Sequence, residues 1–266
     1  MKRFGSRLAL LLLVTMIIGG IPTSALATEP PARTVVIVLA PYLTWADVTS
    51  DVMPATRELA AEGAVGDLNV RSSTRYATDP TQTHIALTMS AGSPCMYDSL
   101  AASAYGVDHP METGTAAEAY RRAMGEDVGA ASIVYLGLPR ILTALAQSTY
   151  DTVPGALGQA IVDAGGSTAA IGNSDGGRRQ GDTYRSRPAA VLAMDATGRV
   201  SFGDVSAGLL VDDPSAPYGV ATDVDAVAAA YARALDDTKA HGGPAMIVLD
   251  AGDPERAANF RKEASP

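Results

Sequence analysis

The stretch Ala245-Met-Ile-Val-Leu-Asp250 decides the fold, because it is an uninterrupted apolar run that ends on a carboxylate. Such a short run is typical of a strand that is buried on both faces in a parallel sheet. It follows residues 223–238, in which apolar residues recur at helical spacing between a cap at Thr222 or Asp223 and a stop at Gly242-Gly243. Together the two segments predict a helix followed by a buried strand that carries Asp250 at its carboxyl end.

Outward from this unit, three further segments are predicted to be strands. Residues 34–40 (Thr-Val-Val-Ile-Val-Leu-Ala) form a β-branched run that we expect to be buried on both faces. Residues 64–70 are predicted to be a short strand, and residues 167–172 an apolar strand. The intervening helices are predicted over residues 83–90, 115–124 and 153–164, and from a cap at Ser50 or Asp51, through Pro54, to Gly63. This alternation indicates an α/β fold with a mostly parallel sheet and helices on both faces.

Two segments of the chain do not follow this alternation. Residues 189–194 and 199–202 flank Asp-Ala-Thr-Gly, a pattern that predicts a β-hairpin. Residues 93–114 are rich in Ser, Pro, Gly, Tyr and Asp and are predicted to form a loop. Because ligands bind at the carboxyl ends of strands in parallel sheets, site residues are expected just after the strands at 34–40, 64–70, 167–172 and 245–250.

Composition limits the classes of function. The chain has 266 residues, of which 47% are hydrophobic and 18% charged, with a formal net charge of −9. These values exclude a disordered or collagen-like protein and suit one globular domain over residues 34–266. The excess of acidic residues argues against nucleic acid as a partner, because phosphate binding needs a basic surface. Cys95 is the only cysteine, so it is either buried or open to intermolecular pairing.

The first 27 residues have the pattern of a secretory signal peptide. Three basic residues precede an apolar run at 8–18, and residues 22–27 end in a small-x-small pattern. We expect cleavage after Ala27, a linker at 28–33, and an exported chain with 17 basic and 29 acidic residues, a net charge of −12. An uncleaved membrane anchor is the alternative, because Ile21 lengthens the apolar run.

Residues 172–176 (Gly-Asn-Ser-Asp-Gly) match the G-x-S-x-G motif of serine hydrolases and follow a predicted strand. Asp223 or Asp236, and then His241, would complete a Ser, Asp, His order. The motif requires a helix directly after the Ser, whereas residues 177–184 have no helical pattern. A serine hydrolase that uses Ser174 is therefore kept as an alternative to a plain strand-to-loop turn.

Residues 76–84 lead into the predicted helix at 83–90 and place Thr81 at its amino-terminal end. A hydroxyl in this position lies beside unpaired backbone amides, which favour an anionic phosphate or sulfate. Thr81 is thus a candidate nucleophile, with His84 one turn further on. The alternative is that Asp79 or Thr81 only caps the helix.

Acidic and amide residues follow several of the predicted strands: Asn69, Asn173, Asp175, Asp250 and Asp253. Such residues bind metal ions, but they are equally common as loop caps and turn formers. Zinc would also require His or Cys, and His84, His109 and His241 lack the spacing of a ligand set. We therefore assign no residue as a metal ligand.

The order of these features resembles the amino-terminal half of the alkaline phosphatase superfamily, in particular its exported bacterial branch. The matching segments are residues 35–48, 53–66, 68–71, 87–92, 171–175 and 248–253. Family members place a Thr or Ser nucleophile at a helix start, which is the position of Thr81. The resemblance implies phosphate or sulfate ester hydrolysis supported by Zn²⁺ or another divalent metal. It places Asn69, Arg71, Asn173 and Asp175 near the substrate, and Asp250 and Asp253 behind them.

The chain departs from the family pattern in two places. Active members carry a metal-binding Asp at the end of the first strand, where this chain reads Ala40-Pro41-Tyr42. They also take further Asp and His ligands from the carboxyl half of the fold, whereas no His follows His241 here. Loss of metal support would remove several kcal/mol of transition-state stabilisation.

The sequence therefore predicts an exported α/β protein with an alkaline-phosphatase-like core that is incomplete at its carboxyl end and has a degenerate metal site. If it is active, we expect a metal-dependent phosphoester or sulfoester hydrolase that uses Thr81. The competing prediction is a non-catalytic binding or scaffold protein associated with the cell envelope or a membrane.

Overall fold

The computed structural model describes residues 33–66, 81–96, 103–148, 150–176 and 185–264, and the backbone of residues 178–179 and 182–183. The predicted signal peptide, linker residues 28–32, Asn69 and Arg71 lie outside the described residues. The helices are α2 (Trp45–Thr49), α3 (Pro54–Glu62), α4 (Gln82–Ala91), α5 (Ala116–Met124), α6 (Leu138–Leu145), α7 (Ala156–Asp163), α8 (Pro188–Ala193), α9 (Val224–His241) and α10 (Asp253–Ala264). The strands are β1 (Thr34–Leu39), β2 (Ala104–Gly106), β3 (Ile133–Tyr135), β4 (Ser167–Ile171), β5 (Arg178–Arg179), β6 (Asp182–Thr183), β7 (Arg199–Val200), β8 (Phe202–Asp204), β9 (Leu210–Asp212), β10 (Val220–Thr222) and β11 (Ala245–Asp250).

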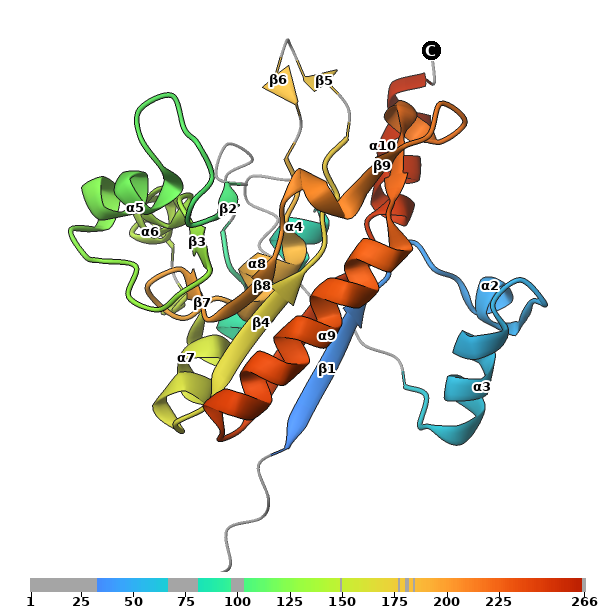
Figure 1. Ribbon diagram of the computed structural model, residues 1–266, viewed down its shortest axis with the longest axis horizontal. Helices are drawn as coiled ribbons and strands as arrows, with labels where there is room; N and C mark the ends of the chain where they lie inside the picture. Colours follow the sequence, from blue (N-terminus) through green and yellow to red (C-terminus); the bar gives the residue numbers. More distant parts are fainter. Residues whose placement is uncertain are drawn as a thin grey trace, which may run out of the picture. The chain divides into compact units, whose positions relative to one another are not determined.

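The central sheet has four parallel strands in the order β1-β11-β4-β8 (Figure 1). The register pairs Leu39 with Asp250, and Leu249 with Ile171. The predicted α/β class with a mostly parallel sheet is confirmed. Because all four strands run the same way, their carboxyl ends meet at one edge of the sheet, where the chain enters the loops after β1, β4, β8 and β11.

Helices cover both faces of the inner strands, as Figure 1 shows for α9 and α8. On one face, Ala169, Ile171 and Ile247 pack with Ala230 and Ala234 of α9. On the other face, the alternate residues of β4 and β11 pack with α8, and α4 packs on α8. Successive side chains of a strand point to opposite faces, and both faces are covered here, so residues 169–171 of β4 and 245–249 of β11 are apolar without interruption. Ser167 and Thr168 at the start of β4 are polar and buried.

The prediction that residues 34–40 are buried on both faces is wrong. β1 is an edge strand, and Val35, Val36 and Val38 are 55%, 41% and 62% exposed. Ile37 and Leu39 pack against the core on the face that α4 and α8 cover. On the opposite face α9 packs mainly on β4, β8 and β11. A β-branched apolar run therefore marks a strand here without showing whether that strand is central.

The predicted hairpin at 189–202 is also wrong. Residues 188–193 form α8, which begins with Pro188 at its first position and is buried along its whole length. The second strand of the predicted hairpin, residues 199–202, is divided between two strands of different sheets. β7 pairs with β3, and β8 pairs with β4. A short helix that is buried all round has no polar face, so its sequence shows no helical period and resembles a buried strand.

The predicted helices correspond to α3, α4, α5, α7 and α9. The cap of α3 is Met53, which makes no side-chain capping hydrogen bond, rather than Ser50 or Asp51. Residues 64–66 of the predicted strand at 64–70 are not in a strand, and the rest of it lies outside the described residues. β2 lies within the segment predicted to be a loop, because three residues are too few to stand out in a Gly- and Ser-rich stretch.

Cys95 is fully buried in the core beside α4, and burial raises the pKa of its thiol to about 12. A buried neutral thiol is inert, so of the two alternatives for this residue the structure supports burial rather than intermolecular pairing. None of the helices in the described part of the chain is both long and apolar enough to span a bilayer.

Candidate functional site

Buried polar side chains gather at the carboxyl edge of the sheet. Asn173 and Ser174 follow β4, Asp250 ends β11, and Glu255 and Arg256 lie in the first turn of α10. All five are at most 3% exposed. We call the set Ser174, Ser186, Asp250, Glu255 and Arg256, with Asn173, the strand-end cluster. The site expected after β4 and β11 therefore exists as a group of polar residues, and its contacts show what it can do.

Hydrogen bonds within the cluster join its hydroxyls to its carboxylates. The Ser174 hydroxyl donates to Asp250 Oδ2, and the amide of Gly252 donates to Asp250 Oδ1 at 3.1 Å. The Ser186 hydroxyl lies 3.1 and 3.0 Å from the two oxygens of Glu255 and 3.2 Å from Thr83 Oγ1 on α4. Because Ser186 donates its one hydroxyl proton to Glu255, the Thr83 hydroxyl is the donor in its contact with Ser186.

The two carboxyl groups of the cluster hold their protons unusually tightly. Burial raises the pKa of Asp250 to about 6, against the opposing hydrogen bond from Ser174. Burial, and next the charge of Asp250, raise the pKa of Glu255 to about 8. Two carboxylates close together in a low dielectric do not both ionise readily. Glu255 is therefore mostly neutral near pH 7, and the pair carries about one negative charge.

Arg256 closes the cluster from the side of α10. Its guanidinium donates to the carbonyl of Asn173 at 2.6 Å, to Thr222 Oγ1 at 2.7 Å and to Asp253 Oδ1 at 2.6 Å. A buried arginine requires such partners, because an unpaired buried charge is strongly destabilising. The cluster is thus bonded to itself and to the surrounding backbone.

Thr81 and His84 do not form a nucleophile and base pair. Thr81 is the N-cap of α4, and its hydroxyl accepts from the backbone amide of His84 at 3.3 Å. The buried imidazole of His84 instead lies with Nε2 2.9 Å from the carbonyl of Cys95. Burial lowers the pKa of His84 and keeps it neutral. Of the two alternatives for Thr81, the geometry supports the helix cap.

The remaining predicted residues are used in other ways. Asn173 donates to the carbonyl of Ser206 at 2.9 Å, and Asp253 accepts from the amide of Thr222 at 3.1 Å. The residues of the serine-hydrolase alternative each have a different partner. Ser174 bonds Asp250, Asp223 caps α9, and the His241 ring packs against Phe202 with centroids 6.1 Å apart.

The donor set at the strand ends does not fit a divalent metal. Within the described ranges, no three or more His, Cys, Asp or Glu side chains are grouped so that they could hold a metal ion. The residue that follows β1 beside Asp250 is Ala40, which brings no carboxylate to this edge. The two carboxyl groups of the strand-end cluster, Asp250 and Glu255, are bonded to serine hydroxyls, and Asp175 and Asp253 are paired with arginines.

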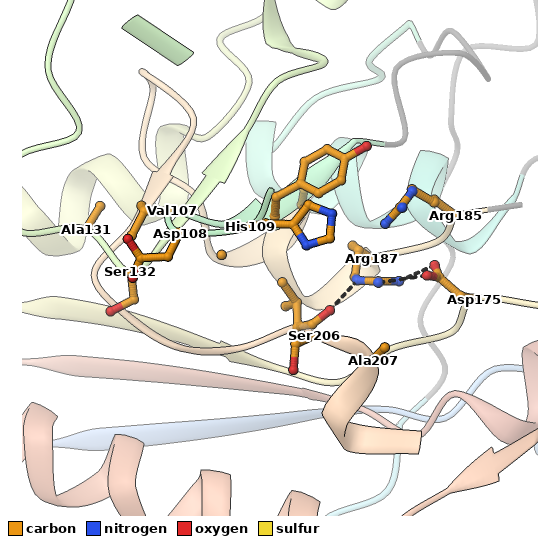
Figure 2. A pocket seen from close by; sticks show the side chains of 14 residues that line it. Val107, Asp108, His109, Ala131, Ser132, Asp175, Arg185, Arg187, Ser206 and Ala207 are labelled. Carbon is orange, nitrogen blue, oxygen red and sulfur yellow. Dashed lines mark hydrogen bonds and ion pairs between the residues drawn. The ribbon is translucent and has the colours of Figure 1, made fainter. Parts of the chain in front are cut away.

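A cavity of about 480 Å³ lies beside the strand-end cluster and is the second candidate site (Figure 2). It is lined by residues of β2 and the loop after it, by Asp175 after β4, by residues 185 and 187 before α8, and by the segment after β8. Among them are Tyr105, His109, Arg185 and Arg187. Asp175, predicted to bind substrate, is the one predicted residue that the structure places in this cavity wall.

Cationic and aromatic side chains converge on one side of the cavity, as Figure 2 shows for His109, Arg185 and Arg187. Arg187 is buried and paired with Asp175, with Nη2 2.8 Å from Oδ2, and it donates to the carbonyl of Val205 at 2.7 Å. The Arg185 guanidinium lies 4.9 Å from the centroid of the Tyr105 ring, a cation–π contact. The Tyr105 and His109 rings are also 4.9 Å apart.

Burial and the charges of Arg185 and Arg187 affect the pKa of His109. Burial, followed by the charges of Arg185 and Arg187, lowers the pKa of His109, while Asp175 opposes the change. The imidazole is therefore neutral near pH 7 and has one N–H to donate.

Comparison with known proteins gives no relative. No family model, curated protein or solved structure matches this chain. The resemblance to the alkaline phosphatase superfamily accordingly stays a prediction. Function must be argued from the chain's own geometry.

The reading of the sequence did not single out His109, Arg185, Arg187, Ser186, Glu255 or Arg256. One signal was available, because Arg187 directly precedes the apolar run of α8 and a charge so close to a buried segment needs a partner. His109, by contrast, lies in the segment predicted to be a loop, and nothing in its local sequence points to Arg185.

Proposed function

We propose that this chain is an exported, non-catalytic binding protein that keeps an alkaline-phosphatase-like sheet as a scaffold. The observation that carries the proposal is the strand-end cluster, whose hydroxyl and carboxyl groups are buried and hydrogen-bonded to one another. A hydrolase would need these groups to face a substrate at the edge of the sheet.

Catalysis by the candidate nucleophiles is disfavoured for two separate reasons. Ser174 is 0% exposed, so its hydroxyl has no room for an attacked carbonyl or phosphoryl group. The Thr81 hydroxyl accepts a backbone amide as a cap, and no base activates it in the part of the chain that the structure describes. An activated nucleophile requires an adjacent base, a lowered pKa or a metal ion.

The cavity beside the strand-end cluster provides a place where a small molecule can bind. The cavity beside the cluster has a volume within the usual range of small-molecule sites, and it presents a few polar groups among apolar ones. Export and association with the cell envelope follow from the pattern of residues 1–27 and are part of the proposal.

The test is hydrolysis of p-nitrophenyl phosphate and p-nitrophenyl sulfate by the purified exported chain with added Zn²⁺, Mn²⁺ or Ca²⁺. We expect no turnover, and no difference between wild type and Thr81→Ala. Thr115→Ala is the matched control, because Thr115 caps α5 in the same way but lies on another helix.

Two outcomes would contradict the proposal. Turnover that Thr81→Ala abolishes and Thr115→Ala leaves intact would identify a metal-dependent hydrolase. Labelling by a fluorophosphonate probe that Ser174→Ala removes would identify a serine hydrolase.

A further inference from the structure

We propose that the cavity between β2 and α8 binds a small organic anion, a carboxylate or phosphate ester, whose oxygens lie between Arg185 and His109. The inference rests on the proposed binding function and names the class of ligand. It depends on three features of the cavity: an arginine with no carboxylate partner among the residues that the structure describes, a nearby second donor, and a separate acidic end.

Arg185 is the cation that a ligand would neutralise. Arg187 is already paired with Asp175, whereas Arg185 has no carboxylate within ion-pair distance in the described part of the chain. Its guanidinium carbon lies over the face of the Tyr105 ring, 4.9 Å from the centroid. An arginine stacked in this way keeps the N–H groups in the plane of its guanidinium for an oxyanion, which it can bind through two parallel hydrogen bonds.

His109 supplies a second donor next to Arg185. The ring of His109 lies 4.9 Å from that of Tyr105, so Arg185 and His109 are neighbours of the same aromatic side chain. Burial, and after it the charges of Arg185 and Arg187, lowers the pKa of His109. An anion placed between them would remove this repulsion and favour the imidazolium, which adds a charge-assisted hydrogen bond.

The other end of the cavity limits the ligand to one anionic group. Figure 2 shows Asp108 beside Ser132, on the opposite side of His109 from Arg185. A carboxylate at this end repels a second negative charge and leaves room for a neutral body with hydrogen-bond donors. The volume of about 480 Å³ exceeds what an inorganic ion needs, which favours an organic ligand.

The charge of Arg185 at one end of the cavity is opposite in sign to the net charge of the protein as a whole. With a net charge of −9, the chain repels anions at long range, so a retained anion needs specific contacts. Non-specific ion pairing therefore would not explain binding that depends on Arg185.

The experiment is a calorimetric titration of the exported chain with phenyl phosphate, benzoate, inorganic phosphate and neutral benzyl alcohol. We expect phenyl phosphate or benzoate to bind, inorganic phosphate to bind at least tenfold more weakly, and benzyl alcohol not to bind. Arg185→Gln should weaken binding at least tenfold. Arg233→Gln, which removes an exposed arginine from α9, should leave it unchanged.

A spectroscopic measurement on the wild-type chain tests the inference independently, in case the Arg185→Gln chain fails to fold. On addition of the bound probe to the wild-type chain, the His109 imidazole resonances should move toward their protonated positions, and those of His241 should stay. Absence of binding by both organic anions, equal loss in the two arginine variants, or unmoved His109 resonances would overturn the inference.

This inference and the proposed function fail in different ways. Hydrolysis of phenyl phosphate together with binding that requires Arg185 would reject the non-catalytic assignment and keep the anion site. No binding and no hydrolysis would reject the anion site and leave the assignment of the strand-end cluster untouched.

Discussion

Arg256 Nη1 donates a 2.6 Å hydrogen bond to the backbone carbonyl of Asn173, which joins the start of α10 to the end of β4. The bond spans 83 residues of sequence and is buried. The same guanidinium reaches Thr222 and Asp253, so one side chain ties together the ends of β4, β10 and α10. The loops at the carboxyl edge of the sheet are thereby closed over the acidic pair.

Arg256→Ala should lower the free energy of unfolding by about 3 kcal/mol, because it leaves buried acceptors without a donor. Urea denaturation followed by circular dichroism measures the change. Arg233→Ala, at an exposed position on α9, should change stability by about 0.5 kcal/mol or less. Equal effects of the two substitutions would show that the buried network does not stabilise the fold.

Glu255→Gln should change how stability depends on pH. The folded-state pKa of Glu255 is raised to about 8 from 4.5, so the folded chain keeps a proton that the unfolded chain releases. The stability that this proton provides is complete below the unfolded pKa and is lost as pH rises through the folded pKa. Between about pH 5 and pH 8, wild type should therefore lose roughly 2–4 kcal/mol relative to Glu255→Gln.

The measurement is the urea midpoint of both chains across this pH range. Glu58→Gln, an exposed position on α3, is the control and should follow the wild-type curve. A Glu255→Gln curve parallel to that of wild type would contradict a neutral Glu255 in the folded chain.

Gly158→Ala should destabilise the protein even though alanine favours helices. A Cβ atom at Gly158 in α7 would lie 2.2 Å from the carbonyl oxygen of Met194, at the end of α8. The overlap should cost about 2 kcal/mol and outweigh the helix propensity gain of about 1 kcal/mol. Thermal unfolding tests this, with Gly66→Ala as control, since a Cβ there meets no atom within 4 Å. A raised Tm for Gly158→Ala would show that α7 and α8 pack less closely.

Anion affinity should increase as the pH falls. In the free protein, burial and two arginines lower the pKa of His109, and a bound anion would raise it, so binding takes up a proton. The charged groups around the ring are Arg185, Arg187, Asp175 and Asp108. Calorimetry with benzoate between about pH 8 and pH 5 should show tighter binding at lower pH, and His109→Gln should abolish the dependence. A pH-independent affinity in wild type would exclude His109 from the site.

Local sequence was sufficient for some elements. β4, β11 and α9 were predicted because each has a clear period or an apolar run with a distinct end, at Gly172, Asp250 and Gly242 respectively. The exposure of β1 and the helical state of α8 were predicted wrongly, since both depend on which neighbours cover the segment. The same apolar composition suits a central strand, an edge strand or a buried helix.

The candidate site was predicted only in part. Asn173, Asp175 and Asp250 were expected at strand ends and lie there, because parallel strands place their carboxyl ends at one edge. Glu255, Ser186 and Arg256 reach the same place from α10 and from the segment before α8, and no local pattern relates them. The cavity depends on Tyr105 and Arg185, which are distant in sequence and meet only in the folded chain.

The sequence by itself determined the α/β class, the strand that ends on Asp250 and the acidic charge of the chain, because these follow from short-range pattern and composition. Only the tertiary structure decided that Ser174 and Asp250 bond to each other within a buried network, and that Arg185 contacts the ring of Tyr105. The physical reason is that burial and pairing are properties of surroundings. The surroundings of a side chain are built by residues far from it along the chain.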